Sequence, residues 1–362
     1  MTPREEQILS WIRENPQISQ QELAEKAGIT RSSVSVHIAN LTRKGLLRGR
    51  GYLLGEEGYV CVVGGVNIDI SGTPHDTLVP GDSNPGYVRI TMGGVGRNIA
   101  ENLCRLGRRV VMITALGEDA NAQTMRQSCR ETGIDLSHSL TVPGGRTSTY
   151  LCLNDEHGDV AGAVSDMAIY EHLTPDYLAG KLDVINHAQL VIADANLTPD
   201  TLSWLADHVT VPLAADPVSS VKAGHLKGML HSLSFFKPNR PEAAMLSGVA
   251  ISTHEDLPRA AAALHEKGVE NVFISLGGEG VYYDDGQDRG ILPILSGPIR
   301  NTNGCGDAFL AAAADGYLMG LSLKQCAQRG LAASCLCAQS ESAVSPLINA
   351  EDVTYLSQYK ED

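Results

Sequence analysis

The sequence predicts a three-layer α/β domain with a mostly parallel sheet, preceded by a small module of three helices and a hairpin. Short apolar runs alternate with helical patterns over most of the chain, which is typical of a parallel sheet covered by helices. Two segments, about residues 67–92 and 146–165, are β-like without helices and predict a small separate sheet that forms a lid. The first 55 residues instead carry helix-start signals.

The first three helices are predicted from their end signals. Capping boxes begin at Thr2 and Ser19, and Thr30 can cap the third helix. Gly28 ends the second helix and leaves only a tight turn before the third. This arrangement resembles the winged helix-turn-helix modules of bacterial transcription regulators, with the basic hairpin at 48–54 as the wing.

Charge is distributed unevenly along the chain. Residues 1–55 hold eight Lys or Arg and five Asp or Glu, although the whole chain has a net charge of −14. A locally basic segment on an acidic protein suggests a surface for nucleic acid. The candidate DNA contacts face away from the apolar stripe of the third helix or lie in the hairpin: Arg31, Ser32, Ser33, Ser35, His37, Asn40, Arg48 and Arg50. A solvated basic face, or three helices that serve only for packing or dimerisation, would show the same pattern.

Residues 59–362 carry the α/β pattern, after a linker at about 55–58. The expected strands are short apolar runs: 60–63, 110–115, 190–193, 211–215, 233–236 and 272–276. The expected helices have a 3.6-residue period: 98–106, 199–207, 254–267 and 306–319. Three further β-like runs fall in the expected lid: 87–92, 148–153 and 159–164.

Several classes of protein are excluded by pattern. The apolar runs are far shorter than the roughly 20 residues of a membrane-spanning helix, and the N-terminus lacks the apolar stretch of a signal peptide. The eight cysteines are scattered, which predicts free thiols in a reducing compartment. Neither a P-loop nor a G-x-G-x-x-G dinucleotide fingerprint is present. We therefore expect a cytoplasmic protein with no membrane partner.

The strongest chemical signal is the run N-T-N-G-C-G-D at residues 301–307, which an Ala-rich helix follows. The small residues at 304–306 let backbone N–H groups converge at the start of that helix, where they can stabilise the anionic oxygens of a transferring phosphoryl group. Asp307 lies at the same point and could take the proton from an attacking hydroxyl. The alternative is a Gly-rich turn in which Asp307 is an ordinary N-cap.

A second Gly-rich run, M-G-G-V-G-R-N-I-A at residues 92–100, allows a ligand to approach the backbone closely. Together with the 301–307 run, it resembles the two signatures of the ribokinase-like (pfkB) carbohydrate kinase family. Three further motifs agree in the expected order: G-G-V-N-I-D at 64–69, K-P-N-R-P-E at 237–242 and S-L-G-G-E-G at 275–280. The resemblance covers about residues 59–350 and implies a ribokinase-like fold and an ATP-dependent kinase.

The resemblance also implies a role for each matching residue. Asp307 would be the general base for a primary hydroxyl, and the N–H groups of Gly304, Cys305 and Gly306 would form the anion hole. The residues implied for substrate binding are Asn67, Asp69, Gly93, Gly94 and Asn98. Those implied for ATP binding are Asn239, Ser275, Gly277, Gly280 and Asn303. Asn239 and Glu242 would position Mg²⁺ through water.

Two residues depart from the family's usual D-T-x-G-A-G-D run. Asn301 replaces the first Asp, which in relatives helps to bind an activating monovalent cation, so activation by K⁺ is doubtful here. Cys305 replaces the usual Ala of the anion hole. It is either an oxidisable thiol with a pKa lowered by the helix N-terminus or a tolerated small residue.

Within the family, the likeness is to pseudouridine kinases, whose glycine motif is matched at 93–103 and whose lid strands are matched at 147–151 and 165–167. Thr149 and Asp166 would then face the base or the ribose, although Asp166 could also be a turn residue at a strand end. Purine nucleosides such as inosine or adenosine, and sugars, are the alternative substrates. A different alternative is a DNA-binding regulator whose kinase-like domain only senses a ligand. Relatives are often dimers through the lid sheet, so we expect a homodimer.

Overall fold

The computed structural model describes residues 1–15, 18–44, 46–48, 53–54 and 58–358. The chain divides into two compact units, Met1–Gly58 and Tyr59–Asp362. Each unit has its own hydrophobic core, so each is described by itself.

The N-terminal unit consists of three helices and a short hairpin. Its elements are α1 (Pro3–Glu14), α2 (Gln20–Ala27), α3 (Arg31–Arg43), β1 (Leu47–Arg48) and β2 (Leu53–Leu54). Both predicted capping boxes are confirmed, since Thr2 and Ser19 each accept a hydrogen bond from the backbone N–H of the Glu three residues later. Ile12, Leu23 and Leu41, one from each helix, are fully buried together. This small core holds α2 and α3 in a helix-turn-helix arrangement.

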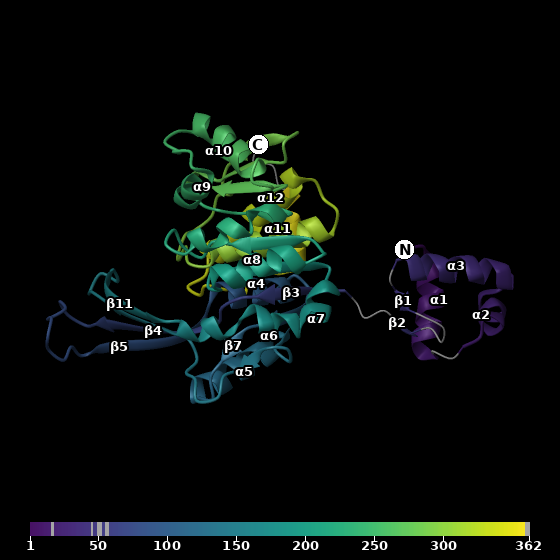
Figure 1. Ribbon diagram of the computed structural model, residues 1–362, viewed down its shortest axis with the longest axis horizontal. Helices are drawn as coiled ribbons and strands as arrows, with labels where there is room; N and C mark the ends of the chain where they lie inside the picture. The colour runs from purple at the N-terminus through teal and green to yellow at the C-terminus, as the bar shows by residue number, and fades with distance from the viewer. Residues whose placement is uncertain (16–17, 45, 49–52, 55–57, 359–362) are drawn as a thin grey trace. The chain divides into compact units, whose positions relative to one another are not determined.

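The second unit is built on a nine-stranded sheet, whose strand β3 is labelled in Figure 1. In spatial order the strands are β17 (Arg289–Leu292), β16 (Val281–Asp284), β15 (Val272–Ser275), β14 (Phe235–Phe236), β13 (Leu213–Asp216), β12 (Leu190–Asp194), β3 (Tyr59–Val63), β6 (Arg109–Ile113) and β8 (Ile134–Asp135). All neighbours pair in parallel except at β16 and β17, which are antiparallel. The sheet confirms the predicted fold class and the six predicted strands.

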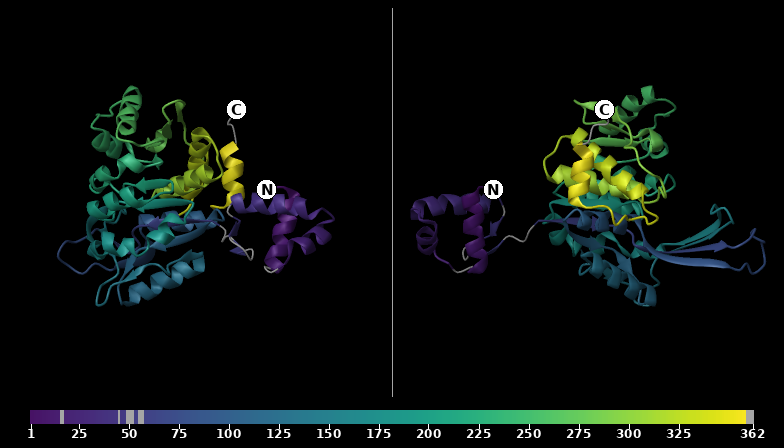
Figure 2. Two further views of the ribbon diagram at one scale, coloured as in Figure 1. Left: turned by 45° about the vertical axis from the view of Figure 1, so that its right-hand side comes forward. Right: turned by 180° about the vertical axis from the view of Figure 1, so that it is seen from behind.

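Helices cover both faces of this sheet, which gives the three predicted layers (Figure 2). One face packs against α4 (Val95–Arg105), α5 (Ala120–Thr132), α11 (Cys305–Leu318) and α12 (Leu323–Ala338). The other packs against α6 (Pro175–Ala179), α7 (Leu182–Asn186), α8 (Pro199–His208), α9 (Arg240–Ser247) and α10 (Leu257–His265). Along β3, Val60 and Val62 enter the first core whereas Cys61 and Val63 enter the second, because side chains alternate across a strand.

The remaining regular elements are short or peripheral. They are β7 (Ala115–Leu116), β9 (Leu140–Thr141), α13 (Ala350–Gln358) and the 3₁₀ turns Ala168–His172, Ala223–Gly228, Leu230–Ser232, His254–Asp256 and Gly277–Glu279. No helix in the described ranges is long and apolar enough to span a membrane.

A separate four-stranded sheet extends from the body of the second unit (Figure 1). Its order is β11 (Val160–Asp166), β10 (Thr149–Asn154), β4 (Asn67–Pro74) and β5 (Gly86–Gly93). The two β-like segments that predicted a lid therefore pair with each other. We call this four-stranded sheet the lid sheet.

The register of the lid sheet separates a polar row from an apolar row. Thr91, Asp69 and Tyr150 lie side by side across β5, β4 and β10, and all three line a pocket. One residue further along, Ile90 and Leu151 flank Ile70 in the neighbouring row, and both are largely exposed. Since successive residues point to opposite faces, the lid sheet has a mainly polar face toward the pocket and a mainly apolar face opposite, although Ile70 also borders the pocket.

Candidate active site

A pocket of about 780 Å³ lies between the lid sheet and the start of α11. Asn196 and Val218, which follow β12 and β13, line it, so it opens at the carboxyl ends of the central parallel strands. That edge is where open α/β sheets bind ligands. The pocket also collects substrate residues that the sequence predicted far apart in the chain: Asn67, Asp69, Gly94 and Asn98, with Asn303 and Gly304.

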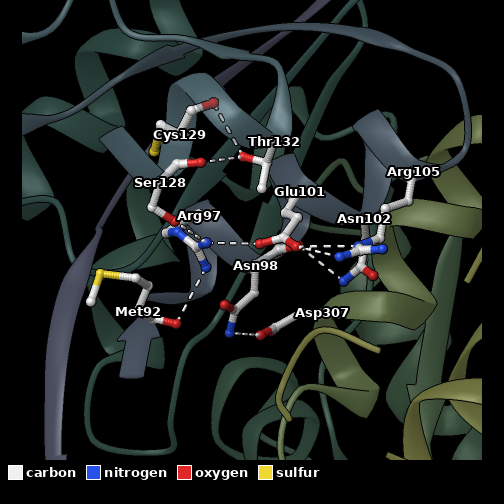
Figure 3. A network of polar contacts seen from close by, with 10 residues as sticks. All are labelled: Met92, Arg97, Asn98, Glu101, Asn102, Arg105, Ser128, Cys129, Thr132 and Asp307. Carbon is white, nitrogen blue, oxygen red and sulfur yellow. Dashed lines mark hydrogen bonds and ion pairs between the residues drawn. The ribbon is translucent and has the colours of Figure 1, made fainter. Parts of the chain in front are cut away.

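Asn98 lines this pocket and contacts Asp307, which lies 209 positions away in the chain and is not itself a lining residue. Asn98 donates from Nδ2 to Asp307 Oδ2 at 2.8 Å (Figure 3). Asp307 lies in the first turn of α11, whose N-cap, Gly304, has a φ of 82°. A Cβ at Gly304 would overlap the carbonyl oxygen of Ala343, so this position requires glycine both for its conformation and for space.

The first turn of α11 supplies the backbone donors that the sequence predicted. The first N–H groups of a helix have no intrahelical acceptor and favour an anion. The Cys305 N–H donates to Thr302 O at 3.3 Å, so among the three predicted amides this one has a competing partner. Gly306 lies close to Lys237, since a Cβ at Gly306 would be 2.9 Å from Lys237 Nζ. A buried ammonium therefore adjoins the helix N-terminus.

The carboxyl of Asp307 is in an unusual electrostatic environment. The pKa of Asp307 is raised to about 8, mainly by burial and also by the negative charge of Asp216. The hydrogen bond from Asn98 and the positive charge of Lys237 lower it. Lys237 Nζ lies 3.5 Å from Asp216 Oδ2, and both side chains are buried. A carboxyl with a raised pKa beside a pocket is characteristic of acid–base sites.

Asp194, a buried carboxylate at the end of β12, holds two Gly-rich segments together. Its Oδ2 accepts hydrogen bonds from the N–H groups of Gly65 at 2.8 Å and Gly96 at 2.9 Å. Its Oδ1 accepts one from the Asn196 N–H at 2.9 Å. Burial raises the pKa of Asp194, and these hydrogen bonds lower it. The loop after β3 and the start of α4 are thus positioned by one side chain.

The predicted sugar-binding residues form a compact polar group. Asn67 donates from Nδ2 to Asp69 Oδ1 at 2.6 Å. Gly93 pairs opposite Asn67 in the lid sheet, and a Cβ there would overlap the Asp69 carboxylate. Burial raises the pKa of Asp69, whereas Asn67 and the charge of Arg97 lower it. Two carboxylate oxygens and an amide held in this way suit the hydroxyl groups of a sugar.

Arg97 connects this group to the surrounding helices (Figure 3). Its guanidinium donates to Glu101 Oε2 at 2.8 Å, to Ser128 Oγ at 3.0 Å and to the Met92 carbonyl at 3.3 Å. Glu101 also pairs with Arg105 at 2.9 Å. The end of β5, the helix α4 and the helix α5 are therefore joined by one buried cation.

Three predicted substrate residues do not line the pocket: Gly93, Thr149 and Asp166. Thr149 and Asp166 pair opposite each other at the ends of β10 and β11, and Asp166 is exposed. Thr149 donates from its hydroxyl to the Thr147 carbonyl at 3.1 Å. The neighbouring residues Tyr150 and Cys152 line the pocket instead.

The predicted nucleotide residues gather around the ends of β14 and β15. Asn239 and Glu242 form a capping box on α9, with Asn239 N to Glu242 Oε2 at 2.8 Å and Glu242 N to Asn239 Oδ1 at 3.0 Å. Asn239 is also bridged to Ser275. Gly277 and Gly280 have φ values of 64° and 107°, which favour glycine.

These residues fit a metal held mainly by phosphate and water. Within the described ranges no three His, Cys, Asp or Glu side chains are grouped as direct metal ligands. Mg²⁺ commonly keeps several waters and binds through one or two carboxylates with phosphate oxygens. Glu242 lies near Asp216 and Lys237, and burial raises its pKa.

Cys305 points away from the pocket. Its thiol contacts the Ser334 carbonyl at 3.5 Å in α12, and Cys337 lies beside it. The hydrogen bond from Cys337 lowers the pKa of Cys305. Asn301, by contrast, lines the pocket, donates to the Glu341 carbonyl at 3.0 Å and accepts from the Asn303 N–H at 2.9 Å.

The predicted DNA contacts on α3 differ in how freely they could reach a ligand. Arg31 and Ser32 are exposed in its first turn, although the Ser32 hydroxyl contacts that of Thr30 at 2.9 Å. Ser35 donates to Gln20 at 2.8 Å, so it ties α2 to α3. The others are also held locally or partly covered: Ser33 contacts Thr30, Asn40 accepts from Arg43, and His37 is half-buried. The Arg48 side chain and Arg50 lie outside the described residues.

Four functional candidates were given no role from the sequence: Asp194, Asn196, Asp216 and Lys237. Three of them follow or end an apolar strand, and polar residues at the carboxyl ends of parallel strands were the available signal. Lys237 is the first residue of the K-P-N-R-P-E run, which was recognised for Asn239 and Glu242.

Comparison with known proteins matches each of the two units to a family model. The pfkB family carbohydrate kinase model matches residues 57–350, and a winged helix-turn-helix DNA-binding model matches residues 1–48. An uncharacterized sugar kinase, YeiI, of Escherichia coli K12 is 36% identical over 362 residues, covering 98% of this chain and 99% of its own.

Two further similar proteins agree with the match to the carbohydrate kinase family. The pseudouridine kinase of the same organism is 36% identical over 309 residues, covering 84% of this chain and 98% of its own. A crystal structure of a putative sugar kinase from Clostridium perfringens has a TM-score of 0.75 at 29% identity, covering 84% of this chain and 96% of its own. Members of this family use ATP and a divalent metal. The chain therefore belongs to the pfkB family of carbohydrate kinases and is an ATP-dependent sugar or nucleoside kinase with an N-terminal winged helix-turn-helix.

Proposed function

We propose that this kinase phosphorylates the primary (5′) hydroxyl of a nucleoside, with pseudouridine as the favoured substrate. The observation that carries the proposal is the 2.8 Å contact of Asp307 with Asn98, which lines the same pocket as Asn67 and Asp69. A carboxyl at a helix N-terminus is thereby joined through one hydrogen bond to a pocket lined with groups suited to a sugar. The 36% identity to a pseudouridine kinase supports the choice of base.

Each residue of the site would act through a contact described above. Asp307 would accept the proton of the 5′-hydroxyl as its oxygen attacks the γ-phosphorus of ATP and the bond to the ADP oxygen breaks. The N–H groups of Gly304 and Gly306, with the ammonium of Lys237, would stabilise the charge on the transferred group. Asn98 would orient Asp307 and the ribose together.

The nucleotide would lie along the residues at the ends of β14 and β15. Asn239, Ser275, Gly277 and Gly280 would contact ATP, as would Asn303 near the pocket. A bound Mg²⁺ would neutralise phosphate charge, and Glu242 would orient its waters. These roles follow from the family motifs and from the local geometry.

We also infer that turnover does not require K⁺. Asn301 is neutral, and its amide already joins the 301–303 turn to the loop at Glu341 through two hydrogen bonds. These bonds hold together two segments without a cation. Equal kcat in Na⁺, K⁺ and Tris buffers would agree with this, and activation of more than tenfold by K⁺ would contradict it.

The test of the catalytic proposal is an ATP-consumption screen over pseudouridine, uridine, inosine, adenosine and ribose, with the product identified by mass spectrometry and ³¹P NMR. We expect the highest kcat/KM with pseudouridine and a 5′-phosphate as product. A sugar that is turned over in preference to every nucleoside would refute the proposed substrate class.

A second function, DNA binding by the N-terminal unit, is favoured by the exposed Arg31 and Ser32 at the start of the second helix of a helix-turn-helix. Binding to the DNA upstream of its own gene should weaken steeply with salt. Arg31→Ala should weaken it further and reduce the salt slope by about 1. Arg4→Ala, which removes the same charge from α1, is the control. If the protein does not bind DNA even at low salt, this function is refuted.

The apolar face of the lid sheet supports the expected homodimer. Ile90, Leu151 and Val164 are 61%, 48% and 64% exposed and lie in one row across the sheet. Light scattering should give the mass of two chains, and Leu151→Glu should give the mass of one. A monomeric wild type would rule the dimer out.

A further inference from the structure

Asn196 belongs to a cluster on the pocket wall that is separate from the Asn98–Asp307 contact. It lines the pocket together with Met167 and Val218. Lys222 supports this part of the wall without lining it. Its Nζ donates to Asn196 Oδ1 at 2.6 Å and lies 3.0 Å from Met167 Sδ.

The Lys222 contact fixes which way round the Asn196 amide lies. An ammonium has three donors and no acceptor, so only the amide oxygen can face it. Nδ2 therefore points to the opposite side and lies beside the Gly65 backbone. A Cβ built on Gly65 would be 2.6 Å from Nδ2. The Asn196 side chain also lies beside Asp194 and lowers the pKa of that carboxyl. Since Nδ2 carries two N–H bonds, one remains for a ligand in the pocket even when Asp194 takes the other.

The segment that carries Lys222 is itself held firmly. Val218 has a φ of 63°, which is uncommon for a β-branched residue. Its N–H donates to Asp216 Oδ1 at 2.7 Å, and the Ser219 N–H donates to the Pro217 carbonyl at 2.6 Å. This tight turn brings the Val218 side chain to the pocket four residues before Lys222.

We propose that Asn196, oriented by Lys222, selects nucleobases that present a carbonyl oxygen, so that uracil and hypoxanthine are accepted over cytosine and adenine. The inference rests on the proposed function, in which the substrate is a nucleoside. Met167 and Val218 provide apolar surface for the flat ring, and the amide provides a donor for its edge. The carboxylate and amide of Asp69 and Asn67, in contrast, suit hydroxyl groups.

The discrimination follows from hydrogen-bond pairing. A carbonyl of the base accepts a hydrogen bond from Asn196 Nδ2. The exocyclic amino group of cytosine or adenine would instead place a second donor against Nδ2, and both donors would stay unpaired. Buried unpaired donors of this kind reduce kcat/KM by about tenfold to a hundredfold. Lys222 acts here as a positioning residue, because it touches Asn196 and not the pocket.

The experiment compares kcat/KM within two pairs, inosine against adenosine and uridine against cytidine, for the wild type and for Asn196→Asp and Lys222→Met. The ratio within a pair cancels any general loss of activity in a variant. We expect the wild type to favour the carbonyl-bearing member about tenfold to a hundredfold. Asn196→Asp offers only acceptors and keeps an oxygen for Lys222, so its ratios should invert. Lys222→Met frees the amide to turn, so its ratios should approach one.

The matched control is Lys227→Met, which removes an exposed lysine from the same segment and should keep the wild-type ratios. Wild-type ratios near one, or unchanged ratios in Asn196→Asp, would overturn this inference while leaving the nucleoside kinase intact. Phosphorylation of ribose with no nucleoside turned over would instead refute the proposed function, and the inference with it.

Discussion

Replacing Asp307 with Asn measures two effects of this carboxyl separately. One is its contribution to kcat, and the other is the free energy of unfolding that is lost because the carboxyl is buried. The substitution keeps the shape, and the new amide oxygen can still accept the hydrogen bond from Asn98 Nδ2. It removes the group that takes up the proton of the hydroxyl. Since positioned acid–base groups contribute about 10²- to 10⁴-fold, kcat should fall by that factor while the KM values change little.

The same substitution should stabilise the protein, and the gain should depend on pH. The pKa of Asp307 is raised by burial from 3.8 to about 8. Its contribution to stability is therefore complete only below about pH 4 and is lost as pH rises toward 8. Each tenfold change in proton affinity corresponds to about 1.4 kcal/mol, so the loss reaches on the order of 5 kcal/mol above pH 8. An Asn at this position does not titrate and avoids that loss.

The assay is thermal unfolding at pH 5 and pH 8, combined with initial rates at each pH. Asp307→Asn should exceed the wild type in Tm at both values, and by several degrees more at pH 8. Asp207→Asn, the same change at an exposed position on α8, should alter neither Tm nor kcat appreciably. A stability gain that is equal at the two pH values, or a kcat within tenfold of the wild type, would refute the assignment of Asp307 as a buried proton acceptor.

Three further substitutions test the surroundings of this carboxyl. Gly304→Ala should lower kcat at least tenfold in rate assays, because its Cβ would collide with backbone; Gly320→Ala, at a similar positive φ but in open space, should cost only about 1 kcal/mol in urea unfolding and leave kcat unchanged. Lys237→Met should shift the rising limb of the kcat/KM pH profile upward, because Lys237 lowers the pKa of Asp307; an unshifted limb would contradict that coupling. Cys305→Ala should keep kcat within threefold of the wild type, because the thiol faces α12; a larger loss would mean that the thiol takes part in the anion hole.

Local signals predicted much of the fold because they act over a few residues. The capping boxes at Thr2 and Ser19 form as their spacing requires, and the apolar runs become strands of the large sheet. The Gly-rich run before α11 does create a helix start with Asp307 in its first turn. In each case, the interacting groups lie within one turn or one strand.

Such local signals do not predict contacts between segments that lie far apart in the chain. Asp194 has no motif around it, and its role exists only because β12 lies beside β3 and opposite the start of α4. Thr149 was expected to face the ligand, but a pleated strand presents alternate residues, and Tyr150 lines the pocket in its place. The orientation of Asn196 depends on Lys222, 26 positions away.

The charges around the pocket explain why the site uses a helix N-terminus. Asp194, Asp216, Glu242 and Asp307 lie together, with Lys237 as the ammonium that contacts this group. Such a cluster repels the phosphates of ATP, so phosphate binding needs positive potential that does not add another titrating side chain. In the proposed mechanism, backbone N–H groups would provide it without desolvating a full charge, and a divalent ion bound with ATP would provide the rest. Because those N–H groups are fixed by the fold, they would stay in place as the proton moves to Asp307 and the local charge changes.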